Sequence, residues 1–362
     1  MMREILIVIL VVGLVVSLPY FFPEKEAPQL TDHELRELAL SLNLKPTPTD
    51  FKTLLKIIDN PQNLLSKEKI ALGKLLFFDP LLSKDKDISC ASCHKLDEGG
   101  DDNLATAIGH RGQANPSHLN SPTVLNAALA TSQFWDARAK DVEAQAHGPI
   151  QASFEMNMTP EELVARLNAI PSYKEIFKRV FPEDINGGIN FDNITKAIGA
   201  YERTLLTRGS FDEFLEGDNN AISEKAKRGL ELFINKGCKG CHTGMSVGGL
   251  SIQKFPLRRN IADLFNVTFS PDFKTIDTTF PFKNTGGFLG KDGSKTFRVP
   301  ILRNVTETSP YFHNGAVKDI EKAVWIMGKY QLGIDFSESQ IDEIVAFLKT
   351  LQGEIIEYRF DD

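Results

Sequence analysis

The feature that most constrains this 362-residue chain is a short pattern, C-x-x-C-H, that occurs twice. Its cysteines and histidines are Cys90, Cys93, His94, Cys238, Cys241 and His242. Two cysteines three positions apart lie on one side of a helical turn, so both thiols can form thioether bonds with one haem, and the next residue can ligate the iron. Because the two motifs use all four cysteines, the sequence predicts two covalently bound haem c groups.

Three other uses of the cysteines fit the pattern less well. A structural zinc site more often gathers its cysteines in one small module and needs no histidine after each pair. A thioredoxin-like redox pair needs a single C-x-x-C in a strand-to-helix setting. A disulfide inside one C-x-x-C is strained. Haem attachment at both motifs is therefore the favoured interpretation.

The N-terminus carries an apolar run from Ile5 to Leu18 that ends at Pro19. The run has the length of a signal-peptide core and only approaches the length of a membrane span. Residues 1–22 are therefore expected to be either a signal peptide or a membrane anchor. Either outcome delivers the rest of the chain across a membrane, where c-type haem is attached.

The charge of the chain narrows the class of partner. The formal net charge is −7 at pH 7, so there is no basic surface of the kind that binds nucleic acid, and we expect no nucleic-acid partner. An acidic surface does suit weak docking of a basic, soluble redox protein.

Apolar residues recur at helical spacing through most of the chain. This periodicity predicts helices over residues 31–42, 66–76, 124–131, 141–146, 160–169, 191–207, 319–327 and 337–351. Ser66 is expected to cap one helix, and Ser223 to begin another that leads into the second motif. Residues 244–295 are rich in Gly, Pro, Asn, Asp and Phe and predict long loops, with short strands at most. The expected fold class is therefore mainly α, with two cytochrome c-like haem domains and long haem-covering loops.

The same plan, an amphipathic helix that ends in C-x-x-C-H, occurs in both halves, which predicts two domains divided near Arg208. The expected segments are residues 1–22 (signal peptide or membrane anchor), 23–48 (linker and N-terminal helix), 49–207 (first haem domain), 208–350 (second haem domain) and 351–362 (a tail that can pack back on the first domain).

Several further motifs, in order, are similar to those of one family. They occupy residues 72–80, 121–126, 133–138, 148–150, 155–156, 299–304, 310–315 and 325–328. Over roughly residues 64–351 the chain resembles the bacterial dihaem cytochrome c peroxidase family. Agreement of several ordered motifs is far more specific than haem attachment alone.

The resemblance implies an enzyme that reduces hydrogen peroxide to water with electrons from a small cytochrome c or cupredoxin. It assigns peroxide chemistry to the haem of residues 49–207 and electron uptake to the haem of residues 208–350. The chemistry needs that division, since an iron that binds peroxide needs an open sixth position and an electron-transfer iron does not. The family also implies a periplasmic protein, with or without an inner-membrane anchor, and a homodimer.

For the second haem, Met327 occupies the position of the family's distal thioether ligand, opposite His242. A soft thioether favours ferrous iron and raises the reduction potential, which suits an electron-accepting site. Without the neighbouring motif, Met327 would be read as an ordinary residue on the apolar face of a helix.

For the first haem, the resemblance assigns catalysis to Glu155 and Gln145, and electron coupling or interface packing to Trp135. Cleavage of the oxygen–oxygen bond needs a group that takes a proton from one peroxide oxygen and returns it to the other, which suits a carboxylate. The neighbouring amide can hydrogen-bond the peroxide. Taken alone, Glu155 would be an ordinary surface acid.

The remaining metal ligands follow from the resemblance only. Asn120 with the carbonyls of Thr308 and Pro310 matches an interdomain calcium site, and oxygen ligands suit that ion. His110 resembles the removable distal ligand of the first haem, but the loop of residues 111–119 is about two residues longer than usual. His118 within this loop is therefore an alternative ligand.

Two other functions compete with the peroxidase. One is a dihaem electron carrier without turnover, in which Glu155 and Gln145 would have no role. The other is a relative that oxidises a protein side chain, and in that branch a tyrosine replaces Met327.

The chain departs from the family pattern at a second place besides the longer loop of residues 111–119: Ala137 stands where glycine is usual.

Overall fold

A computed structural model describes residues 30–184, 187–257 and 280–358 of the chain. The predicted signal peptide or membrane anchor lies outside these ranges, as does part of the predicted loop of residues 244–295. Within the described ranges, no helix is both long enough and apolar enough to cross a membrane.

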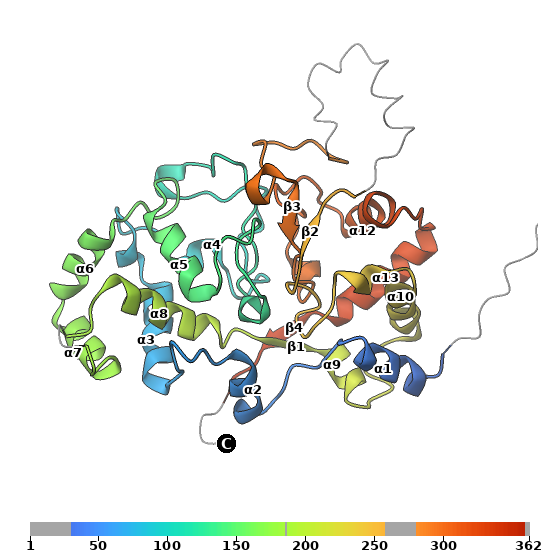
Figure 1. The fold of residues 1–362 in the computed structure, drawn as a ribbon, viewed down its shortest axis with the longest axis horizontal. Coiled ribbons are helices and arrows are strands. Elements are labelled where there is room, and N and C mark those ends of the chain that lie inside the picture. The colour runs from blue at the N-terminus through green and yellow to red at the C-terminus, as the bar shows by residue number, and fades with distance from the viewer. Residues whose placement is uncertain (1–29, 185–186, 258–279, 359–362) are drawn as a thin grey trace, which may run out of the picture.

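Helices dominate the fold, and strands are short (Figure 1). The α-helices are α1 (Asp32–Ser41), α2 (Phe51–Ile58), α3 (Lys67–Phe78), α4 (Cys90–Cys93), α5 (Val142–Gln151), α6 (Pro160–Asn168), α7 (Pro171–Val180), α8 (Phe191–Glu202), α9 (Ser210–Leu215), α10 (Glu224–Asn235), α12 (Ile320–Ile326) and α13 (Glu338–Thr350). The strands are β1 (Thr207–Gly209), β2 (Ile252–Lys254), β3 (Thr296–Arg298) and β4 (Gly353–Ile355). Short 3₁₀ turns and one π-helix, η7 (Met327–Leu332), complete the described chain. The mainly α fold class is confirmed.

Helix starts follow the local sequence. The side chain of Ser66 accepts a hydrogen bond from the backbone of Lys69 at the start of α3, and Ser223 caps α10 through Ala226 in the same way. Such caps satisfy backbone donors that the helix itself cannot pair. Both predicted caps are confirmed.

Two predicted helices differ from the structure. The helix expected over residues 124–131 is wrong: only a 3₁₀ turn at residues 127–129 is present. Asn126 adopts a left-handed conformation, and its side-chain amide exchanges hydrogen bonds with Thr207, so tertiary contacts override helix propensity. The helix expected over residues 191–207 ends at Glu202, because the chain turns there into β1. Periodicity also missed α2, α7 and α9.

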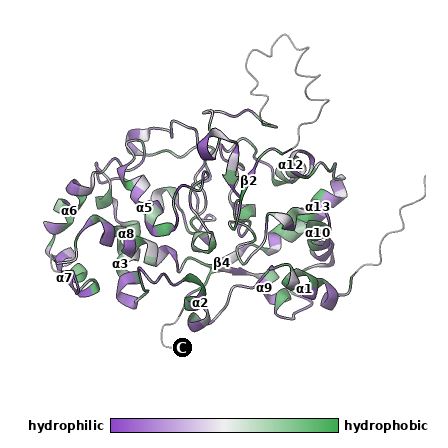
Figure 2. Cartoon of the chain, in the orientation of Figure 1, coloured by the Kyte–Doolittle hydropathy of each residue, from purple (hydrophilic) through white to green (hydrophobic). Residues whose placement is uncertain are grey.

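The buried apolar residues form two large cores. The first lies among α3 and α5 to α8, and the second among α1, α9, α10 and α13. Figure 2 shows that most of these helices carry an apolar side and a polar side, the pattern of helices that bury one face. Helix α1 contributes Leu35 and Ala39 to the second core, although it precedes the first haem motif in sequence.

The same helix crossing occurs in both halves. A Cβ atom on Gly73 of α3 would lie 1.9 Å from the carbonyl oxygen of Ala197 in α8. A Cβ on Gly229 of α10 would lie 1.8 Å from the carbonyl of Glu343 in α13. In each case the helix that leads to a C-x-x-C-H motif crosses the last helix of its domain at a glycine, because only glycine allows this approach.

A short antiparallel sheet joins the two halves. Strand β1 pairs with β4, and the backbone N–H of Ile356 donates to the carbonyl of Leu206 at 2.9 Å. Further along the tail, the hydroxyl of Tyr358 donates to the carbonyl of Pro48, and its ring lies against Phe51. The end of the chain therefore returns to the segment where the two cores meet.

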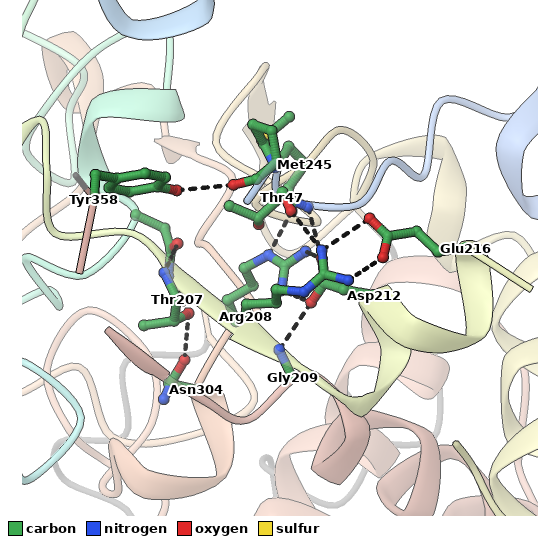
Figure 3. Close-up of polar contacts among 12 residues, drawn as sticks. Thr47, Thr207, Arg208, Gly209, Asp212, Glu216, Met245, Asn304 and Tyr358 are labelled. Atoms are coloured by element: carbon green, nitrogen blue, oxygen red, sulfur yellow. Dashed lines mark hydrogen bonds and ion pairs between the residues drawn. The ribbon is translucent and has the colours of Figure 1, made fainter. Parts of the chain in front are cut away.

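A fully buried ion pair between Asp212 and Arg303 lies next to β1, and Figure 3 shows Asp212 beside Thr47 and Gly209. The carboxylate of Asp212 accepts both terminal nitrogens of Arg303 at 2.6 and 2.7 Å, and neither side chain is exposed. Asp212 also accepts the backbone N–H groups of Thr47 and Gly209 at 2.7 and 2.9 Å. Every partner that a buried carboxylate needs is therefore present, drawn from three separate segments.

Removing this carboxylate should strongly destabilise the protein. We expect Asp212→Ala to lower the free energy of unfolding by about 3–5 kcal/mol, because the Arg303 guanidinium would stay buried without a counter-charge. Asp342→Ala, which removes an exposed partner of Lys225, is the matched control and should cost less than about 1 kcal/mol. Denaturant unfolding of the haem-loaded variants measures both changes, and equal losses would contradict this role for the buried pair.

Candidate active site and haem centres

The first haem motif lies in a cavity of about 340 Å³. Helix α4 carries Cys90 and Cys93, and Ser89 and Ser92 form a reciprocal capping box at its start. The cavity is lined by both cysteines and His94 together with Gln145 and Glu155. Residues from three separate parts of the chain therefore meet in one space.

The second motif lies in a different cavity, of about 240 Å³. Its wall includes Cys238, Cys241 and His242, with Met327 contributed by the segment after α12. Much of the remaining wall is apolar, with Phe233 and Phe336 among its members. Each C-x-x-C-H motif thus has its own cavity, as two separate haems require.

The positions of the four cysteines, and the absence of disulfide bonds between them, fit thioether attachment of haem. All four are free of disulfides, and the two pairs line different cavities, so they do not form one four-cysteine zinc site. Burial raises the pKa of Cys93 and of Cys238 to about 12, so both are protonated thiols when nothing is bound to them. The disulfide and zinc interpretations therefore have no support in the geometry.

Both motif histidines are in the neutral form that ligates iron. The Nδ1 atom of His94 lies 3.1 Å from the carbonyl of Gly100, which orients the ring and leaves Nε2 for a metal. Burial lowers the pKa of His94, and it lowers the pKa of His242 to about 4. The residues present therefore fit a haem in each cavity, and each motif histidine is a neutral imidazole that could ligate its iron.

Met327 begins the π-helix η7 directly after α12. It lines the same cavity as His242, which is the placement that the ligand prediction requires. The neighbouring Gly328 allows close packing, since a Cβ there would lie 2.4 Å from the ring of Phe336. A π-helical turn at this point is notable because such turns frequently occur at functional sites.

The predicted catalytic pair converges on the first cavity. Gln145 lies on α5, which Asp141 caps through the backbone of Ala144. Glu155 follows α5 in a tight turn in which its N–H donates to the carbonyl of Ala152 at 2.9 Å. Burial raises the pKa of the Glu155 carboxyl, and the positive charge of Arg138 opposes this rise. The turn therefore brings an acid of raised pKa and an amide to the wall that His94 also lines.

Neither predicted distal histidine lines that cavity. His110 is buried in a 3₁₀ turn, where its Nδ1 lies 3.8 Å from Asp85 and its backbone N–H donates to the carbonyl of Glu155. His118 is half-buried in a left-handed conformation, and the backbone of the preceding Ser117 and the Cβ atom of His118 pack closely against Gly286. In this conformation neither histidine is part of the wall that His94, Gln145 and Glu155 line.

Trp135 lines both cavities. Its indole N–H donates to the carbonyl of Asn120 at 2.9 Å, and its ring lies 6.4 Å from that of His313 in an edge-to-face arrangement. Ala137, two residues later, has a φ of +59°, which explains why this position suits glycine. The tryptophan is thus held in the wall between the two haem centres.

The three predicted calcium ligands line one cavity wall. Asn120, Thr308 and Pro310 all belong to the wall of the second cavity, and the side-chain N–H of Asn120 donates to the carbonyl of Leu104. This bond leaves the amide oxygen as the atom available to a cation. Among the residues that the structure describes, no group of three or more His, Cys, Asp or Glu side chains is arranged to hold a metal.

Sequence reasoning missed three charged residues at these cavities. Asp101 lines the second cavity, has one carboxylate oxygen without a partner, and has a pKa raised to about 7 by burial. Glu202 lines the first, and burial next to Glu143 raises its pKa to about 8. Arg298 lines both. The only signal in the sequence was a charge beside otherwise apolar residues, which does not distinguish a cavity wall from the surface.

Comparison with known proteins supports the assignment of the two cavities to two haems. The family model for di-haem cytochrome c peroxidase matches residues 67–220. The cytochrome c551 peroxidase of Nitrosomonas europaea is 44% identical over 78% of this chain and 79% of its own, and that of Pseudomonas aeruginosa is 42% identical over 80% of both. A crystal structure of a MauG-like protein associated with microbial copper homeostasis superimposes with a TM-score of 0.66 at 25% identity, over 83% of this chain and 94% of its own.

Relatives this similar, aligned over most of both chains, confirm the resemblance that the sequence motifs indicated. They agree with two separate cavities that each hold one C-x-x-C-H motif. The chain therefore belongs to the dihaem cytochrome c peroxidase family, as an enzyme with two covalent haems.

Proposed function

We propose that this protein reduces hydrogen peroxide to water in the first cavity, with electrons from a small cytochrome c or cupredoxin that enter through the second haem. The observation that carries this proposal is the convergence of Glu155 and Gln145 on the cavity that also holds His94. The haems, when bound, supply one-electron redox chemistry at iron. The protein supplies proton transfer, orientation and the route between the two centres.

In this proposal Glu155 moves the proton. Reduction of one peroxide molecule breaks its oxygen–oxygen bond, consumes two electrons from the donor and two protons, and yields two molecules of water. The carboxylate of Glu155 would take a proton from one peroxide oxygen and return it to the other as the bond breaks. Burial raises the pKa of Glu155 towards the pH at which the enzyme works, and proton exchange in both directions is most efficient there. Gln145 has no titratable proton, so it orients the peroxide by a hydrogen bond.

The second centre takes up electrons. His242 and Met327 line one cavity, which supports a His/Met axial pair and a high reduction potential. Trp135 lines both cavities, so it either carries electron coupling or packs the wall between the haems, and both roles are compatible.

The competing functions have less support. A pure electron carrier gives no reason for an acid and an amide to line the cavity of one haem only. A relative that oxidises a protein side chain would carry tyrosine where this chain has Met327. Peroxide reduction uses all three residues.

The finer properties of the protein belong to the same proposal. Asn120, Thr308 and Pro310 would hold a calcium ion, and the cavity wall that they share also contains Asp101, whose unpartnered carboxylate oxygen is a ligand type that suits a hard cation. We also infer a periplasmic homodimer, with residues 1–22 as signal peptide or inner-membrane anchor. The first haem domain spans 49–207, and the second spans 208–350.

Loss of the carboxylate should separate catalysis from haem binding. We expect Glu155→Gln to keep both haems and electron uptake but to lose peroxide turnover by about 10²- to 10⁴-fold, because the outer oxygen would leave unprotonated. Gln145→Ala should lose less, since it removes orientation but not the proton. Steady-state turnover with excess reduced cytochrome c measures both, and haem absorbance is the control for assembly. Wild-type turnover by Glu155→Gln would reject this site and favour the electron-carrier function.

The axial ligand of the second haem should set its potential. We expect Met327→His to lower the upper step of a redox titration followed by absorbance, because a second imidazole stabilises ferric iron relative to a thioether. The Glu155→Gln variant, changed only at the other haem cavity, is the control and should keep the upper step. An unchanged upper step in Met327→His would show that this methionine is not the ligand.

The distal ligand of the first haem should be removable. We expect this iron to be coordinated by two histidines when fully oxidised, and to lose the distal one when the second haem is reduced. The loop of residues 107–120 must move for this, since neither His110 nor His118 lines the cavity in the present conformation. Spectra of His110→Ala and His118→Ala identify the ligand, because only its loss should make the resting iron high-spin. A wild-type enzyme that is already high-spin when oxidised would contradict the gate.

A further inference from the structure

Arg298 is a buried cation at the boundary between the two haem cavities. It ends strand β3, is 5% exposed, and lines both cavities. One of its two terminal nitrogens, Nη1, is buried and has no hydrogen-bond partner. An arginine with an unused donor at such a place is unusual, since buried polar groups are nearly always paired.

Both the backbone and the side chain of Arg298 are held by residues of the first half of the chain. The backbone N–H of Arg298 donates to the carbonyl of Trp135 at 2.9 Å, and its Nε donates to the carbonyl of Phe134 at 3.3 Å. On the strand itself, Arg298 pairs with Ile252 of β2. These contacts hold the base of the guanidinium group and leave its outer end for another partner.

The other buried arginines of the described chain show what is missing. Arg303 is paired with Asp212, and Arg203 lies 3.1 Å from Glu143 and 3.5 Å from Asp59. No acidic side chain in the described ranges pairs with Arg298. Burying a charge without a counter-charge is costly, so an anion from outside the polypeptide should complete this site.

The family cofactor supplies such an anion. Each haem c carries two propionate side chains that end in carboxylates, and the residues of both cavities fit a haem. A guanidinium group has five N–H donors in a planar fork that matches carboxylate geometry, and it can serve more than one carboxylate. Although burial lowers the pKa of Arg298 to about 10, the group stays positively charged at neutral pH.

We propose that Arg298 binds propionate carboxylates of both haems and so acts as one cation shared by the two redox centres. The proposal rests on the two-haem content of the chain and not on the reduction of peroxide. It makes Arg298 a cofactor-binding residue that positions both haems against the segment of Phe134 and Trp135. The same positive charge would also raise the reduction potentials of both haems, since a nearby positive charge favours the more reduced state of each iron.

The test is a redox titration of the haem-loaded enzyme followed by absorbance. Arg298→Gln removes the charge with little loss of volume, and both midpoint potentials should fall. A unit charge roughly 10 Å from an iron in a protein interior changes a reduction equilibrium on the order of tenfold. A tenfold change is about 59 mV for a one-electron couple.

Two further variants sharpen the result. Arg138→Gln is the matched control: this arginine lines the first cavity alone and is half exposed, so the potential of the second haem should not move. Arg298→Lys keeps the charge but loses the fork, and both potentials should fall less than in Arg298→Gln. A fall in only one potential, or in neither, for Arg298→Gln would overturn the shared site.

A direct measurement covers the case in which Arg298→Gln fails to take up both haems. A crystal structure of the wild-type holoenzyme should place Nη1 or Nη2 within about 3.2 Å of a propionate oxygen from each haem. Terminal nitrogens bonded only to water or to protein carbonyls would overturn the proposal. Because neither experiment uses peroxide, failure here leaves the peroxidase function intact, and loss of peroxidase activity would leave this site untouched.

Discussion

The close crossing of two helices at a glycine is the constraint on which both halves of the protein depend. In the first half Gly73 brings α3 against α8, and in the second Gly229 brings α10 against α13. Each crossing fixes the end of the helix that leads into a haem motif, so the cysteines and the axial histidine emerge at the edge of the core. A larger side chain at either glycine would meet a backbone carbonyl, which cannot move without disturbing the partner helix.

The same scaffold supports two different centres because the opposite wall of each cavity comes from a different kind of segment. In the first domain the wall after α5 is a tight turn that presents Glu155 beside Gln145. In the second domain the corresponding group is Met327, at the start of a π-helical turn. A carboxylate can exchange protons and a thioether cannot, so the division of chemistry that we propose between the two haems would follow from these short segments.

The junction between the domains is polar but almost fully paired. The Asp212–Arg303 pair and its backbone donors satisfy one another, and the β1–β4 ladder satisfies the backbone on either side. Arg298 is one of several buried groups with an atom that has no hydrogen-bond partner, as are Thr47 and Asp101, but it is the cation that lines both cavities, and no acidic side chain of the described residues pairs with it. This combination of buried charge, free donor and position is the reason we propose that Arg298 binds propionate carboxylates of both haems.

How much the sequence alone determined depends on the range of the interactions involved. The two haem motifs, the caps at Ser66 and Ser223 and most of the helices rest on spacings of a few residues, and ordered motifs were enough to indicate the family. The failed helix at residues 124–131 shows the limit, because Asn126 bonds to Thr207, far away in the chain. The cavity-facing charges Asp101, Glu202 and Arg298 were also invisible, since only tertiary packing decides whether a charged side chain meets water or a buried wall. Likewise, only the fold places His110 and His118 away from the first cavity, because a loop's sequence does not specify which surface it packs against.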